Sequence, residues 1–211
     1  MVFDTIINSV KNRFQSAYDN VTNRDGIEDI RAENLSCRDI MYSARKLEGM
    51  AKSMTTKAGV NDEKVLLIRR IGLASWLGGR AAEQLADEKL IIFINIFRAP
   101  AEPLDVKIEA IKTISSICCL NSKIQTKILI NGFLGDMLEV IAVDLPPCIE
   151  LQKWIIYCLI CLCADNATIQ KELLKYPYLQ SVLSRFQTES WFSWKRNEAK
   201  ELMDILAFGR R

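Results

Sequence analysis

The chain has 211 residues, of which 49% are hydrophobic and 26% charged, enough for one sizeable core or a short array of repeats. Because 28 Lys and Arg residues are balanced by 26 Asp and Glu residues, the net charge of +2 provides no overall field to attract nucleic acid. The longest apolar run, residues 154–164, is shorter than the roughly 20 residues that cross a bilayer. Composition therefore argues against a nucleic-acid role and against a membrane role.

Histidine is absent, which excludes Ser-His-Asp and Cys-His catalysis and mixed Cys/His zinc sites. The seven cysteines are an odd number, and most fall inside apolar helical runs, where reduced thiols are typical. We interpret the CxxC spacing of Cys158 and Cys161 as two small core residues, with a metal site as the alternative. The N-terminus shows no signal-peptide pattern, so we expect a cytoplasmic protein with no catalytic residue, cofactor or metal.

Residues 1–60 precede the regular part of the chain. Apolar residues recur at helical spacing over residues 4–19 and predict an amphipathic helix. Three interpretations stay open for it: a cap on the first repeat, a helix that docks onto a partner, and a helix that lies on a membrane surface. Residues 20–35 are predicted to form a loop, and a second amphipathic helix is predicted from about Ser36. The first apolar stripe contains Ile6, Ile7, Val10, Phe14, Ala17 and Tyr18.

A repeat with an offset of 45 residues follows. Two units are clear, at about 105–147 and 148–188, and a weaker unit at about 62–104 matches the next with an offset of about 44. Each clear unit contains a long apolar helix, an Asn that can cap a shorter helix, and a third helix rich in apolar residues. The identical pairs are Ile111/Ile156, Cys118/Cys163, Asn121/Asn166, Ile124/Ile169, Gln125/Gln170, Leu134/Leu179 and Leu138/Leu183.

The segment 121–141 resembles the armadillo repeat signature. A polar turn and Gln125 precede an apolar helix, then Gly132 and a final helix rich in leucine; residues 166–186 are similar, with Pro177 where the glycine stands. The resemblance implies an all-α fold, a short right-handed α-solenoid of about three armadillo-like repeats. In size and number of units the chain is similar to the armadillo-like helical domain-containing proteins.

The repeats and the patterns at the two ends together predict three parts: N-terminal amphipathic helices and a loop in residues 1–60, armadillo-like repeats in 61–188, and a C-terminal capping helix in 189–211. Peptide-binding armadillo proteins of the importin-alpha type carry an Asn ladder on the long helix, and here Ile117 and Leu162 stand at those positions. The resemblance therefore argues against recognition of nuclear-import signals. It favours docking of a helix in a groove or onto a flat surface.

Two groups of residues are candidates for binding a protein partner. The helix predicted to open at Trp191, Phe192 and Trp194 is expected mainly to cover the last repeat, with a partner hot spot at Trp191 and Trp194 as the alternative. A basic group on one side of the first unit suggests an acidic surface or an acidic helix on the partner, and a solvated face is the alternative. This basic group contains Arg69, Arg70, Arg80 and Lys89.

The leading function is a noncatalytic protein–protein interaction module, an adaptor or scaffold that binds a partner along its helical surface and has no small-molecule substrate. The alternative is a structural component of a ciliary, axonemal or other cytoskeletal assembly, with the corresponding localisation. Nucleic-acid binding ranks below both, because the charges nearly cancel.

Overall fold

The computed structural model describes residues 46, 60–76, 80–143, 149–192, 194 and 196–208. Within these ranges all regular secondary structure is α-helical, as the sequence predicts. The helices are α3 (Val60–Trp76), α4 (Arg80–Arg98), α5 (Leu104–Cys118), α6 (Ser122–Ile130), α7 (Phe133–Ala142), α8 (Ile149–Cys163), α9 (Ala167–Leu173), α10 (Leu179–Thr188) and α11 (Glu198–Ile205).

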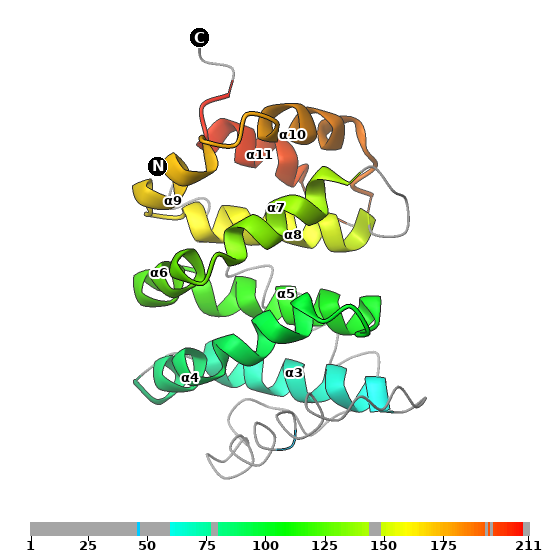
Figure 1. Ribbon diagram of the computed structural model, residues 1–211, viewed down its shortest axis with the longest axis vertical. Coiled ribbons are helices and arrows are strands. Elements are labelled where there is room, and N and C mark those ends of the chain that lie inside the picture. Colours follow the sequence, from blue (N-terminus) through cyan, green and yellow to red (C-terminus); the bar gives the residue numbers. More distant parts are fainter. Residues whose placement is uncertain are drawn as a thin grey trace.

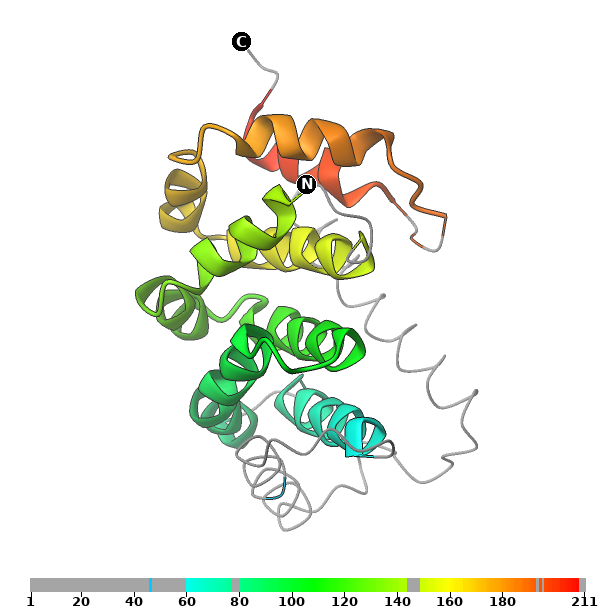
Figure 2. The ribbon, with the colours of Figure 1, turned by 45° about the vertical axis from the view of Figure 1, so that its right-hand side comes forward.

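The helices form a two-layer solenoid. Helices α3, α5, α8 and α11 pack side by side in that order and make one layer, which follows the long axis of the molecule (Figure 1). Helices α4, α6, α7, α9 and α10 make the second layer and cover one side of the first (Figure 2). The predicted fold class, a short helical solenoid, is therefore confirmed.

The two N-terminal helices predicted before residue 60 lie outside the described residues apart from Lys46, which is helical and forms an ion pair with Glu63 of α3.

Each long helix of the two clear repeats ends in the same turn. Leu120 and Asp165, which are 45 residues apart, both adopt left-handed φ angles, of 56° and 55°. This turn redirects the chain into the short helix, where the side chain of Asn121 accepts a hydrogen bond from the Ile124 N–H at 3.2 Å. The side chain of Asn166 does the same at the start of α9. Both predicted caps are confirmed.

A buried glutamine joins the turn of one unit to the turn of the next. Gln125, only 2% exposed, donates its amide to the Cys118 carbonyl at 3.1 Å, and the equivalent Gln170 bonds Cys163 in the same way at 2.9 Å. The Gln125 amide also reaches two carbonyls at the end of α8, while its oxygen accepts from Asn166 at 2.8 Å. The carboxyl-terminal ends of α5 and α8 are therefore fixed relative to each other by one side chain.

Helices α3 and α5 approach each other closely at one glycine. A methyl group built on Gly72 would lie 2.8 Å from Oγ1 of Thr113, so the two helices meet where the first has no side chain. At the other end of α3, Lys64 and Glu102 form a nearly buried ion pair at 2.7 Å. The weaker first unit thus meets the second where Gly72 lies against Thr113, and the Lys64–Glu102 pair joins parts of the first unit itself; neither contact uses the Asn–Gln turn of the later units.

The C-terminal helix starts later than predicted. It begins at Glu198, because Asn197 caps it by accepting from the Lys200 N–H at 3.1 Å. The described residues between Trp191 and Asn197 are not helical, so the prediction of a helix that opens at Trp191 is wrong. Buried residues of α11 pack against α8 and α10, so the expected cover of the last repeat is present.

We predict that Gln125→Ala lowers the free energy of unfolding by about 3 kcal/mol, because it leaves buried carbonyls of two helix ends without their donor. Gln170→Ala is the matched control: its half-buried side chain bonds the end of α8, and we expect a loss of about 1 kcal/mol. Urea unfolding of both variants measures the difference. Equal losses would show that the link between units adds nothing.

Candidate partner-binding face

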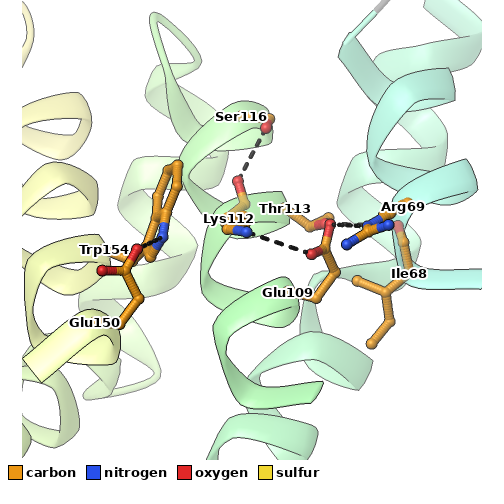
Figure 3. Close-up of polar contacts among 8 residues, drawn as sticks. All are labelled: Ile68, Arg69, Glu109, Lys112, Thr113, Ser116, Glu150 and Trp154. Atoms are coloured by element: carbon orange, nitrogen blue, oxygen red, sulfur yellow. Dashed lines mark hydrogen bonds and ion pairs between the residues drawn. The ribbon is translucent and has the colours of Figure 1, made fainter. Parts of the chain in front are cut away.

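Five side chains form a continuous polar and aromatic strip across three neighbouring long helices. They are Arg69 of α3, Glu109 and Lys112 of α5, and Glu150 and Trp154 of α8, and we call them the long-helix face (Figure 3). The strip exists because the repeat stacks these helices side by side in one layer.

A single carboxylate joins the two cations of this face. Glu109 lies 3.1 Å from Nε of Arg69 on the neighbouring helix and 3.7 Å from Nζ of Lys112 on its own helix. Glu109 is buried, whereas the side chains of Arg69 and Lys112 are about one third exposed, at 33% and 32%. The buried carboxylate therefore holds both cations in place, and each keeps part of its surface for another contact.

The strip continues onto α8 through an aromatic ring. The ammonium of Lys112 lies 4.8 Å from the ring centre of Trp154, a distance typical of a cation–π interaction. The indole N–H of Trp154 donates to Glu150 at 3.0 Å. Trp154 is thus held from both sides, with its ring half-exposed between a cation and a carboxylate (Figure 3).

Trp154 also belongs to an aromatic cluster, which consists of Trp154, Tyr157, Trp191 and Trp194. Trp194 packs on Trp154 with ring centres 4.6 Å apart, and Trp191 meets Trp194 edge to face at 5.5 Å. Trp191 is 8% exposed and donates its indole N–H to the Phe186 carbonyl at 2.8 Å. Of the two predicted tryptophans, Trp191 therefore lies mainly in the interior, and half-exposed Trp194 lies beside the long-helix face.

The predicted basic group is not one free cationic surface. Arg69 is paired with Glu109, and Lys89 is only 8% exposed. Arg70 is half-exposed, and its Nε has no hydrogen-bond partner. Arg80 begins α4, but its side chain lies outside the described part of the structure. The role of these four residues in binding stays a prediction.

Sequence reasoning missed Glu109, Lys112 and Trp154, although a signal for them was present. With the offset of 45 residues, Glu109 matches Trp154 and Lys112 matches Tyr157. Positions that are polar in one repeat and aromatic in the next are not constrained by the shared packing. Such positions mark a face whose chemistry can vary along the stack.

The described residues hold no cluster that suggests catalysis at a thiol or a metal. Within them, no group of three or more Cys, Asp or Glu side chains could hold a metal ion. Burial raises the pKa of Cys163 to about 12, and a hydrogen bond to Cys119 together with burial raises the pKa of Cys161 well above its usual value. Burial and the neighbouring Cys158 do the same for Cys118. These thiols stay protonated near neutral pH and are poor nucleophiles.

No helix among the described residues is long and apolar enough to span a bilayer.

We predict that alkylation of the native protein with iodoacetamide at pH 8 modifies Cys119 first among the described cysteines, because it is half-exposed and the others are buried. Peptide mass spectrometry at successive times measures the order. Rapid labelling of Cys118, Cys158, Cys161 or Cys163 in the folded chain would contradict their placement in the core.

The comparisons with known proteins agree with this architecture. A family model described as armadillo-like helical domain-containing protein 2 matches residues 2–210. No curated protein and no solved structure matches the chain. The match covers nearly the whole sequence and agrees with the resemblance shown by the repeats. The chain therefore belongs to the armadillo-like helical domain-containing protein 2 family.

Proposed function

We propose that the chain is a noncatalytic adaptor or scaffold that binds a protein partner along the long-helix face. An armadillo-like helical domain suggests a protein-interaction module. The main support for placing the binding site on this face is the half-exposed Trp154. Its ring is held between Lys112 and Glu150 and lies next to Trp194. Tryptophan is enriched among the residues that dominate binding energy.

The contacts of this face favour binding, because they order the side chains before a partner arrives. Glu109 fixes Arg69 and Lys112, and Lys112 and Glu150 fix the Trp154 ring. Ordering of long side chains costs each interface about 0.5–1.5 kcal/mol per residue. A face that is already ordered avoids part of this cost.

The size of the face indicates what it can bind. Neighbouring packed helices lie about 8–10 Å apart, so a strip from α3 to α8 is about 20 Å long. A helix of about 13 residues has that length, at 1.5 Å per residue. The α3 end offers Arg69, and the α8 end offers Trp154 and Trp194. The complementary partner is a helix or surface with an acidic group for the first end and apolar anchors for the second.

The partner is first recovered by proximity labelling, with both the soluble and the detergent-insoluble fraction searched. We expect two substitutions on the long-helix face to weaken binding of this partner. Trp154→Ala removes an aromatic anchor, and the dissociation constant should rise about 30-fold. Arg69→Gln removes the cation at the α3 end and keeps a hydrogen-bond donor for Glu109, so it tests the acidic group on the partner directly. Isothermal titration with purified proteins measures both effects.

Matched controls come from the second layer. Ile130→Ala alters a side chain that is 78% exposed at the end of α6, and Lys171→Glu reverses an exposed charge on α9. Both should leave the dissociation constant unchanged. If Trp154→Ala and Arg69→Gln fold normally by circular dichroism and bind like the parent chain, the long-helix face is not the binding surface.

A further inference from the structure

Four cysteines meet where the end of α5 packs against its neighbour α8 (Figure 1). Cys118 is the last residue of α5 and Cys119 follows it, while Cys158 and Cys161 lie one turn apart on α8. A hydrogen bond joins the thiols of Cys119 and Cys161, and another joins those of Cys118 and Cys158. All four are free thiols in this structure. Two thiol pairs therefore cross the boundary between the two clear repeats.

The two thiol pairs differ in their access to solvent. Cys118 and Cys158 are both fully buried, and so is Cys161. Cys119 is half-exposed. Of the two pairs, a water-soluble oxidant can therefore reach the one formed by Cys119 and Cys161, and it meets Cys119 first.

The shared packing of the repeats does not require a thiol at either position of this pair. With the offset of 45 residues, Cys161 corresponds to Ser116 and Cys119 corresponds to Ala164. Small side chains without a thiol thus satisfy the equivalent positions. Each of the two thiols is an addition to the repeat, and the two additions are in contact with each other.

We propose that Cys119 and Cys161 form an oxidation site at which hydrogen peroxide produces a disulfide between the two clear repeats. In the first step the Cys119 sulfur attacks one peroxide oxygen, the O–O bond breaks, and Cys119 becomes a sulfenic acid while the thiol proton leaves with the other oxygen as water. In the second step the Cys161 sulfur attacks the Cys119 sulfur and the S–O bond breaks. The Cys161 proton leaves with the hydroxyl group as a second water. Two thiols are oxidised and one peroxide is reduced.

The low acidity of Cys161 suits the second step and excludes the first. A hydrogen bond to Cys119 and burial raise the pKa of Cys161 well above its usual value, so it stays protonated and reacts poorly with peroxide itself. Its contact with Cys119 places its sulfur beside the sulfenic sulfur, and the leaving hydroxyl group accepts its proton. Proximity thus takes the place of acidity.

The disulfide links the two helix ends that Gln125 already holds. The Gln125 amide bonds the carbonyls of Cys118 and Cys161 at 3.1 and 3.3 Å, so the backbone on both sides is fixed before oxidation. A bond between Cys119 and Cys161 closes a loop that contains α6 and α7, and it restricts the unfolded chain. Oxidation therefore strengthens the boundary between the repeats. It does not depend on the proposed function, because it occurs within one chain.

Peroxide treatment of the full-length reduced chain tests the site. After blocking of the remaining thiols, we expect a loss of about two free thiols per chain and a tryptic peptide 113–123 linked to peptide 154–171. Both peptides contain more than one cysteine, so variants assign the bond. Cys119→Ala and Cys161→Ala should abolish the linked peptide, and the matched controls Cys118→Ala and Cys158→Ala should keep it. Circular dichroism checks that each variant is folded.

Three outcomes of this experiment would overturn the proposal. They are a linked peptide that survives Cys119→Ala, a bond from Cys119 to Cys37, Cys148 or a second copy of the chain, and oxidation of Cys119 to a sulfinic acid without any linked peptide.

Two further measurements test the order of the steps and the effect on the fold. In Cys161→Ala the sulfenic acid has no thiol to meet, so dimedone should label Cys119 about tenfold more than in the parent chain. Equal labelling in the two folded chains would contradict the second step. The oxidised parent chain should melt about 5–10 °C higher than the reduced chain, and dithiothreitol should reverse the shift. A lower melting temperature would show that the bond forms only when the repeats separate, which would also overturn the proposal.

Discussion

The stacking of the two clear repeats depends on one carboxamide, that of Gln125. It bonds the end of α5, reaches two carbonyls at the end of α8, and accepts from the Asn that caps α9. These are groups that a helix end would otherwise leave unsatisfied in the interior, where each costs about 1–3 kcal/mol. The requirement to satisfy them sets how one unit is placed on the next. The side-by-side placement of α5 and α8, and hence the part of the long-helix face that joins Lys112 to Trp154, follows from it.

The repeat constrains packing but leaves the face free to vary. Buried positions agree between units, as Cys118 and Cys163 do, whereas Glu109 in one unit is replaced by Trp154 in the next. This change gives the layer a charged part over α3 and α5 and an aromatic part over α8. The two parts of the layer therefore offer different chemistry to a partner. The binding role thus depends on residues that the fold itself does not require.

Much of the fold could be predicted because its signals are local. Asn121 and Asn166 each accept a hydrogen bond from the backbone N–H three residues ahead, and Gly132 adopts the left-handed φ of 69° that glycine tolerates best. The start of α11 was missed because Trp191 and Trp194 fit a helical pattern, although Asn197 provides the actual cap. The pairing of Arg69 with Glu109 joins residues 40 positions apart in two different repeats, and the burial of Lys89 depends on tertiary packing. Local patterns carry no information about either contact.

We propose that the long-helix face of this armadillo-like domain binds a protein partner. Hydrogen–deuterium exchange of the full-length chain, with and without the recovered partner, tests it most directly, because it maps the contact without any substitution. The account predicts slower exchange in α3, α5 and α8 on binding, with α6, α9 and α10 unchanged. Slower exchange confined to α6, α9 and α10 would place the partner on the second layer and contradict the account.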